Sequence, residues 1–274
     1  NELVIRSRRR WHYDGSTTSA QRRDDRTRYL VSVVFASESA GLVYPDGTQA
    51  LTDTSVIVTA GEFVSIVGPS GCGKSTLLRM ASGLIAPTSG SISRTGTVQF
   101  VFQDSTLLPW RTVRKNVALN LELQKVDQHI IDERTSAALA LVGLTDSAEK
   151  LPRQLSGGMK MRTSLARSLV CEPDLYLFDE PFAALDEFSR ERLNIELRTM
   201  LSSRNAGSLF VTHSIAEAVF LSHRVLVMSP RPGSIVKEFV IPFGNDRDQN
   251  LRYSSEFAQV SGEIAQSLRE LTPL

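Results

Sequence analysis

Apolar residues gather in short continuous runs along the chain, and stretches with helical spacing separate several of these runs. The runs span residues 63–67, 175–178, 208–211 and 225–228. Residues 188–201 and 215–221 have the spacing of helices. Short apolar runs bounded by turn residues are typical of strands buried on both faces of a parallel sheet. Strands that alternate with helices connect by crossovers, so the pattern predicts an α/β fold around a parallel sheet.

The segment before the first of these runs has a different pattern. Residues 31–35 and 54–58 are strand candidates, and Tyr-Pro-Asp-Gly at residues 44–47 is a turn candidate between them. We therefore expect a small antiparallel sheet that precedes the parallel core.

A helical region is expected from about residue 105 to residue 155. Its helix candidates are residues 113–123 and 131–142, with a short turn near Ala148. Ser156 is then a candidate N-cap for a helix over residues 159–170, which Pro173 would end. A last helix is expected near the C-terminus, packed on the core or on a partner, because apolar residues recur there with helical spacing at Phe257, Val260, Ile264 and Leu268.

Residues 68–75 read Gly-Pro-Ser-Gly-Cys-Gly-Lys-Ser and fit the pattern G-x-x-x-x-G-K-[ST] between a strand candidate and a helix candidate. Glycines let backbone N–H groups wrap an anion, and a helix N-terminus favours negative charge. Lys74 is predicted to reach the β- and γ-phosphates, and Ser75 to place its hydroxyl on Mg²⁺. The loop is therefore predicted to bind a nucleoside triphosphate through Gly68, Pro69, Ser70, Gly71, Cys72, Gly73, Lys74, Ser75 and Thr76.

The apolar run at residues 175–178 ends in two carboxylates, Asp179 and Glu180. Ligands of open α/β sheets bind at the carboxyl ends of the strands, where these acids are expected. Asp179 is predicted to hold Mg²⁺ through water. Glu180 is predicted to orient or deprotonate the water that attacks the γ-phosphate.

A second motif, Leu-Ser-Gly-Gly-Met at residues 155–159, gives the chain a resemblance to the ATP-binding subunits of ABC transporters. The resemblance covers about residues 43–243, with the motifs in the family's order. Ser156, Gly157 and Gly158 would present free N–H groups to an anion at the start of a helix. The resemblance implies that this motif closes over the γ-phosphate held by a second copy, so that two ATP molecules lie between two domains.

Four further residues receive roles from this resemblance. It implies that His213 contacts the γ-phosphate and helps to position the attacking water, and that Gln103 touches Mg²⁺ or that water. It places Asp186 in a loop that crosses the dimer interface. It also places Tyr44 under the adenine ring, the alternative being an aromatic residue of the turn beside Pro45.

The fold implied by the resemblance is that of a P-loop NTPase (RecA-like): a parallel-sheet core with an antiparallel β subdomain and an inserted helical subdomain. We expect the ATP-binding domain over residues 29–243, the helical subdomain that carries the signature at about residues 105–160, and a C-terminal helical tail over residues 244–274. Residues 1–28 contain eight Arg and carry a net charge of +4. They are expected to be a disordered extension, the alternative being a basic arm on anionic lipid headgroups.

The composition of the chain limits the kinds of partner and the compartment that we expect. The 274 residues carry a net charge of +1, which gives no reason to expect a nucleic acid. Two cysteines, Cys72 and Cys171, argue against a disulfide framework and fit a reducing compartment. No apolar run approaches the roughly 18–20 residues of a membrane span, so we expect a chain that reaches the cytoplasmic face of the membrane through a partner.

Three segments, residues 103–110, 158–162 and 228–233, resemble the nitrate/sulfonate/taurine subgroup of importers. The expected function is the ATP-hydrolysing subunit of an importer, acting as a homodimer or paired subunits with a membrane permease and, indirectly, a solute-binding protein. Trp110 is expected to be exposed where the permease docks. Alternatives are a soluble ABC-type ATPase without a permease, and the same importer role for bicarbonate or a pyrimidine precursor. The signature argues against a P-loop kinase.

Overall fold

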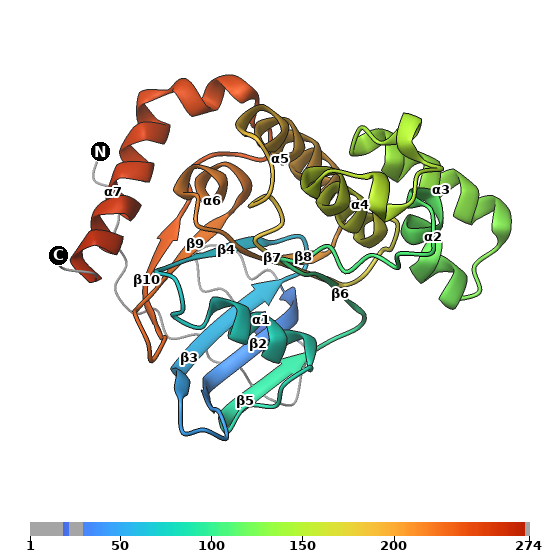
Figure 1. The fold of residues 1–274 in the computed structure, drawn as a ribbon. Helices are drawn as coiled ribbons and strands as arrows, with labels where there is room; N and C mark the ends of the chain where they lie inside the picture. The colour runs from blue at the N-terminus through green and yellow to red at the C-terminus, as the bar shows by residue number, and fades with distance from the viewer. Residues whose placement is uncertain (1–18, 22–29, 272–274) are drawn as a thin grey trace.

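The computed structural model describes residues 19–21 and 30–271, and a six-stranded sheet forms its centre (Figure 1). The strand order is β10-β9-β4-β8-β7-β6. The strands are β4 (Phe63–Val67), β6 (Val98–Val101), β7 (Leu175–Asp179), β8 (Gly207–Val211), β9 (Arg224–Met228) and β10 (Ile235–Val240). Every residue of β4, β7, β8 and β9 is buried, which explains their apolar sequences.

Neighbouring strands from β9 to β6 run parallel, which confirms the predicted parallel core. Two strands of this central sheet, β10 and β6, were not predicted. β10 pairs antiparallel with β9 at one edge, and its mixed sequence around Lys237 and Glu238 follows its partial exposure. β6 has only four residues, so its sequence carries little periodic signal.

A second, antiparallel sheet lies below the first in Figure 1, and it confirms the expected β subdomain. Its longest strand, β2 (Leu30–Val43), pairs with β1 (Ser19–Gln21), β3 (Gln49–Thr59) and β5 (Ser89–Arg94). The predicted turn joins β2 to β3, with the Gly47 N–H donating to the Tyr44 carbonyl at 2.9 Å. No strand was predicted at β5 or at β1. The rest of the basic segment 1–28 lies outside the described residues.

Helices cover the central sheet on both faces. α1 (Lys74–Ser82) lies between the two sheets, and its Leu77 and Leu78 are fully buried. α5 (Glu187–Ser202) and α6 (Ile215–Leu221) cover the other face, where Phe220 joins a second apolar core.

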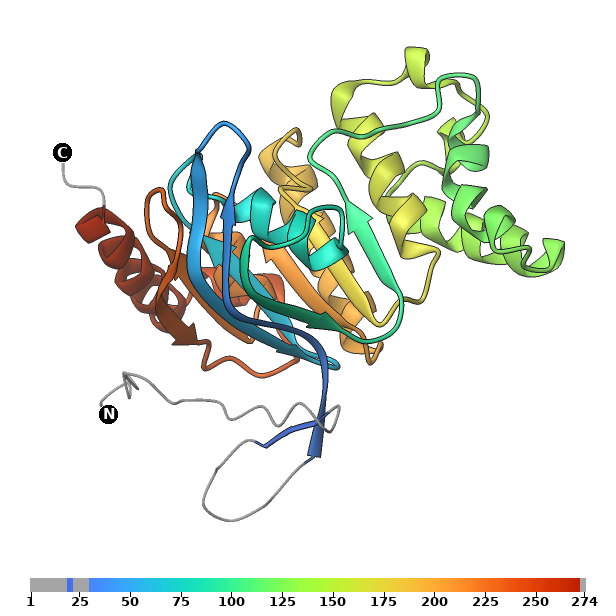
Figure 2. The same cartoon turned by 90° about the horizontal axis from the view of Figure 1, so that it is seen from below.

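The predicted helical subdomain projects from one end of the sheet (Figures 1 and 2). It contains α2 (Val113–Leu123), α3 (Gln128–Leu141) and α4 (Gly157–Leu169), with 3₁₀ turns at Thr145–Ser147 and Pro152–Gln154. The side chains of Thr112, Asp127 and Ser156 cap the three helices.

The C-terminal segment forms a helix that packs on the core, one of the two arrangements expected from its apolar spacing. A 3₁₀ turn, η3 (Gln249–Tyr253), leads into α7 (Ser255–Leu271), which runs beside β9 and β10. Phe257, Val260 and Ile264 of α7 are buried. In the described part of the chain, no helix is long and apolar enough to cross a membrane.

Candidate functional site

The phosphate loop joins β4 to α1 at the carboxyl edge of the central sheet. Gly73, the residue before α1, has a φ of +107°, a conformation that L side chains rarely adopt. A Cβ at Gly73 would lie 2.6 Å from the Leu51 side chain and 2.9 Å from the Ala50 carbonyl. The position therefore requires glycine, both for its backbone conformation and for the close approach of β3.

Lys74 lies inside the curve of this loop. Its side chain is buried, and its Nζ donates to the carbonyl oxygens of Gly68 and Pro69, each at 2.9 Å. A buried ammonium held by the loop's own carbonyls is placed where an anion wrapped by the loop would meet it. Phosphate binding by Lys74 stays a prediction.

Ser75 and Asp179 form the second part of the site. The Ser75 hydroxyl donates to Asp179 Oδ1 at 2.8 Å, which joins the start of α1 to the end of β7. Burial raises the pKa of Asp179, and the nearby Glu180 raises it further, while the Ser75 hydroxyl lowers it. A hydroxyl beside a buried carboxylate is a pair of hard oxygen donors of the kind that Mg²⁺ binds, so these two residues fit a magnesium site.

Glu180 and His213 follow the neighbouring strands β7 and β8. His213 Nε2 lies 2.7 Å from Glu180 Oε1. The Glu180 N–H donates to the Val211 carbonyl at 3.0 Å, and the φ of Glu180 is +48°. A non-glycine residue in the left-handed region is uncommon and often marks a functional position. This backbone turns the Glu180 side chain off the strand toward His213.

Tyr44 lies beside the same loop. Its hydroxyl is 3.2 Å from Thr76 Oγ1 in the first turn of α1, and its ring packs against the core beneath the phosphate loop while remaining partly exposed. The structure thus brings Tyr44, Thr76, Lys74, Ser75, Asp179, Glu180 and His213 to one edge of the sheet.

The signature residues lie at the start of α4, and Asp186 lies at the start of α5. Gln103 lies two residues beyond β6, the parallel neighbour of β7. Ser156 Oγ accepts from the Met159 N–H at 3.3 Å, and Ser156 and Gly157 are exposed at the start of α4. Gln103 is exposed after β6. Asp186 is exposed and caps α5. Its carboxylate accepts a hydrogen bond from the Ser189 N–H, and this hydrogen bond lowers the pKa of Asp186. Among the described residues, none of these shares a hydrogen bond with the phosphate loop, Asp179 or Glu180.

One contact of the phosphate loop was missed by sequence reasoning. Arg231, in the turn between β9 and β10, donates from Nε to the Gly71 carbonyl at 3.1 Å. A Cβ at Gly233 in the same turn would lie 2.0 Å from the Cys72 carbonyl. No turn was predicted at residues 232–233, although a Pro-Gly pair is typical of one, and nothing in the sequence indicates that this segment packs on the phosphate loop.

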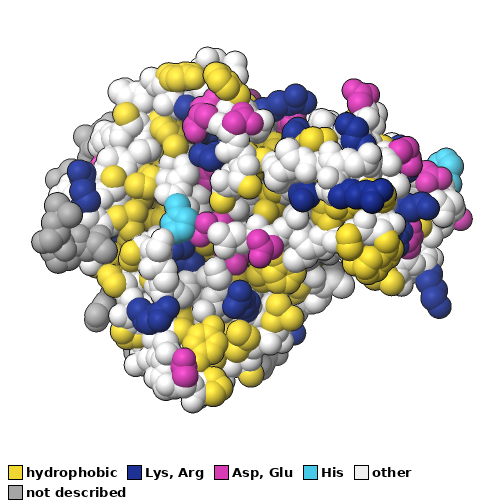
Figure 3. Space-filling view, viewed as in Figure 1, with side chains coloured by type: hydrophobic (Ala, Val, Ile, Leu, Met, Phe, Trp, Pro, Cys, Tyr) yellow, Lys and Arg dark blue, Asp and Glu magenta, His cyan; other side chains and the backbone are white. Residues whose placement is uncertain are grey.

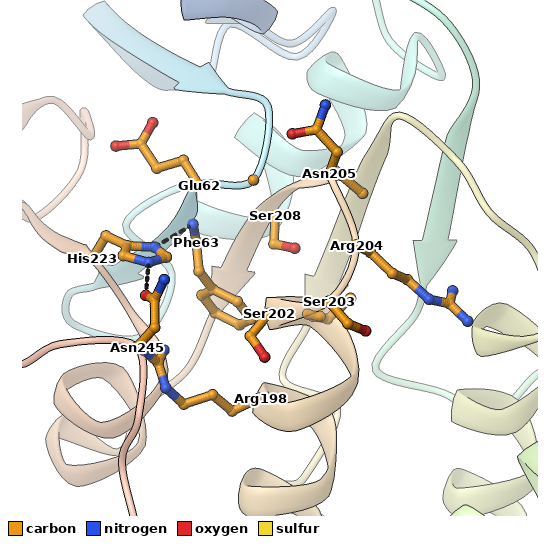
Figure 4. Close-up of a pocket in the computed structure, with 13 residues that line it drawn as sticks. Glu62, Phe63, Arg198, Ser202, Ser203, Arg204, Asn205, Ser208, His223 and Asn245 are labelled. Carbon is orange, nitrogen blue, oxygen red and sulfur yellow. Dashed lines mark hydrogen bonds between the residues drawn. The ribbon is translucent and has the colours of Figure 1, made fainter.

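A cavity of about 380 Å³ lies at the opposite edge of the sheet, where β4 and β8 begin (Figure 4). Two of its polar side chains, His223 and Glu62, are paired within the fold. His223 Nδ1 accepts from the Phe63 N–H at 2.9 Å, and its Nε2 lies 3.0 Å from Asn245 Oδ1. Burial lowers the pKa of His223, and Glu62 pairs with Arg224 at 2.6 Å. These contacts hold together a part of the fold that lies away from the carboxyl ends of the strands.

Comparison with known proteins agrees with this geometry. The sequence profile of the family described as "ABC transporter" matches residues 51–183. The nitrate import ATP-binding protein of a Synechocystis species is 42% identical over 234 residues, which cover 80% of this chain and 88% of that protein. The taurine import ATP-binding protein of Roseobacter denitrificans is 39% identical over 231 residues, covering 80% and 86%. A bicarbonate transport ATP-binding protein of Synechocystis is 39% identical over 227 residues, covering 78% and 80%.

Solved structures of ATP-binding cassettes are also similar to this chain. A dimeric post-hydrolysis state of an ATP-binding cassette bound to ADP and Pi superposes with a TM-score of 0.70 at 29% identity, covering 77% of this chain and all of that one. A dimeric bacterial ABC transporter cassette gives the same values. This chain belongs to the ABC transporter family. It is one of that family's nucleotide-binding ATPase subunits.

Proposed function

We propose that this chain is the ATP-hydrolysing subunit of an ABC importer for a small anion. The observation that carries the proposal is the cluster at the carboxyl edge of the sheet, where a buried Lys74, the Ser75–Asp179 pair and the Glu180–His213 pair surround one phosphate loop. Relatives whose names specify import of nitrate or taurine are 42% and 39% identical to this chain over 80% of its length.

Each residue of the cluster has a proposed role. The phosphate loop and Lys74 bind and orient the β- and γ-phosphates, and the Tyr44 ring stacks on adenine. Ser75 and Asp179 would hold Mg²⁺, with Gln103 as a further oxygen ligand; when bound, the ion neutralises charge on the phosphates. Glu180 holds the attacking water and accepts its proton. His213, fixed beside Glu180, faces the γ-phosphate.

A second copy of the chain completes the site. Ser156 and Gly157 are exposed and Gly158 is partly exposed at the start of α4, a helix N-terminus where an anion is favoured and the motif supplies no cation. In the proposed dimer this motif lies over the γ-phosphate bound by the partner, and Asp186 lies at the interface. Two solved structures of one matching cassette are dimeric, which supports this arrangement.

The helical subdomain is the proposed docking site for the permease. Trp110 has 74% of its surface exposed, as the sequence predicted, and Leu123 has 72%. Hydrophobic side chains gather on the outer part of this subdomain, with acidic and basic side chains interspersed around them (Figure 3). Large exposed apolar residues are costly unless a partner covers them. The chain would therefore lie at the cytoplasmic face of the membrane, held by a permease that receives solute from a solute-binding protein.

The relatives named for nitrate, taurine and bicarbonate transport suggest a small anion as the solute. Uptake of labelled nitrate, taurine and bicarbonate should be compared in cells of the source organism that lack this chain and in cells complemented with the wild type or Lys74→Ala. The proposal expects uptake of one anion to return with the wild type alone. Equal uptake of all three in the deletion strain and its parent would contradict it.

A further inference from the structure

The loop that follows β8 contains a helix-capping pattern, Ser214-x-x-Glu217, which the structure uses in an altered form. Ser214 Oγ accepts from the Glu217 N–H at 3.3 Å, as an N-cap should. In a capping box, the glutamate would accept from the N-cap N–H in return. Here the Ser214 N–H donates instead to Thr212 Oγ1 at 3.0 Å, and the Thr212 hydroxyl donates to Glu217 Oε2. The Glu217 carboxylate therefore accepts a hydrogen bond from Thr212, the residue before His213.

The other oxygen of this carboxylate faces Arg190 on α5. Arg190 Nε lies 3.4 Å from Glu217 Oε1, and Arg190 Nη2 donates to the Leu185 carbonyl at 2.9 Å. Leu185 immediately precedes Asp186. One arginine therefore connects the Glu217 carboxylate, in the first turn of α6, to the turn that carries Asp186.

This connection is largely shielded from water. The side chains of Glu217 and Arg190 are 6% and 25% exposed. Burial raises the pKa of Glu217, whereas the Thr212 hydroxyl, Arg190 and Arg252 lower it and Glu187 raises it. Removing one partner of a buried ion pair leaves an uncompensated charge, so such a pair is sensitive to loss of either member.

We propose that Arg190 and Glu217 are positioning residues that hold the His213 loop and the Asp186 turn in one fixed relation. The inference rests on the proposed function, in which His213 faces the γ-phosphate and Asp186 faces the partner copy. When the Asp186 turn contacts a second copy, this bridge carries its position to the His213 loop. His213 and the Glu180 carboxylate beside it are thereby held in place. Hydrolysis in one site thus depends on contact with the other subunit.

The test uses the purified full chain with Glu217→Gln, Arg190→Ala and the double variant. The matched control is Arg192–Glu196, an ion pair on the same helix with a 2.8 Å contact and side chains 67% and 23% exposed, changed to Arg192→Ala and Glu196→Gln. For each protein, kcat and KM for ATP, the Kd of a fluorescent ATP analogue and the melting temperature are measured. Arg190→Lys, which keeps the charge but lacks the forked head, replaces Arg190→Ala if that variant does not fold.

We expect Glu217→Gln and Arg190→Ala each to lower kcat about tenfold while Kd stays within about twofold, and the double variant to be no slower than the slower single variant. The two control variants, Arg192→Ala and Glu196→Gln, should leave both kcat and Kd unchanged. Independent, multiplying losses in kcat would overturn the bridge. A Kd that rises and a melting temperature that falls in step with the loss of kcat would also overturn it. A wild type that does not hydrolyse ATP would instead refute the proposed function, whereas hydrolysis that is insensitive to these variants refutes the bridge alone.

Discussion

His213 Nε2 and Glu180 Oε1 lie 2.7 Å apart, and this contact joins the ends of β7 and β8 in front of the phosphate loop. A carboxylate accepts hydrogen bonds, so the contact places a proton on Nε2 of His213. The imidazole then fixes the direction of the Glu180 carboxylate. The strained φ of Glu180 supports the same geometry from the backbone.

Lys74→Ala should lower kcat/KM for ATP by at least about a hundredfold, because it removes the cation placed inside the phosphate loop. A phosphate-release assay on the purified chain measures this. Lys115→Ala, at an exposed position of α2, is the matched control and should hydrolyse ATP like the wild type. A Lys74→Ala protein with activity within a few-fold of the wild type would show that Lys74 does not bind the phosphates.

Tyr44→Ala should weaken ATP binding about tenfold and leave kcat at saturating ATP nearly unchanged, because stacking on a base contributes equally before and during the reaction. Tyr44→Phe keeps the ring and loses the contact with Thr76, so its affinity should stay within about twofold of the wild type. Equal losses of affinity in both variants would assign the effect to the hydroxyl, and no loss in either would make Tyr44 a structural residue of the turn.

Trp110→Ala should leave the melting temperature and the ATPase activity of the isolated chain unchanged, since the side chain is 74% exposed. It should weaken assembly with the permease by more than about tenfold and reduce uptake accordingly. Co-purification with the permease and an uptake assay measure these effects. Tyr253→Ala removes an equally exposed aromatic residue outside the helical subdomain and should leave assembly intact. Loss of melting temperature in Trp110→Ala would contradict the docking role.

Asp179→Asn should raise the melting temperature of the nucleotide-free chain by a few degrees near neutral pH. Burial raises the pKa of Asp179, so its ionised form reduces the stability of the folded chain once the pH exceeds the ordinary aspartate range. As pH falls through the raised pKa, the wild-type carboxyl becomes protonated and the difference between the two proteins should shrink. Melting curves from about pH 4 to pH 8 test this. A difference that grows toward acid pH would contradict the assigned direction.

Several parts of this architecture were predictable because their signal is local. The phosphate loop carries its glycines at the positions where the backbone needs them, and Ser156 caps α4 as its position before the helix predicted. The strands β4, β7, β8 and β9 are continuous apolar runs because both of their faces are buried.

Other parts depend on contacts between distant segments and left no local signal. β10 and β5 lie at sheet edges, where exposure allows mixed sequences. The contact of Arg231 with Gly71 spans 160 positions in the chain. The roles given to Gln103 and Asp186 came from resemblance alone, since an exposed Gln or Asp has no distinguishing pattern of its own. The Arg190–Glu217 contact likewise required the packing of α5 against α6 to be known.

The most direct test of the account is the size of Glu180→Gln in the presence of ATP and Mg²⁺. Glutamine keeps the shape of the side chain but cannot accept the proton of the attacking water, so ATP should remain bound between two copies. Size-exclusion chromatography with light scattering should then show a particle of about twice the 30.2 kDa mass of one chain, which returns to a single chain when ATP is removed. Adding Lys74→Ala to this variant should abolish the dimer. A Glu180→Gln chain that binds ATP yet remains a monomer would contradict the shared site at the centre of the account.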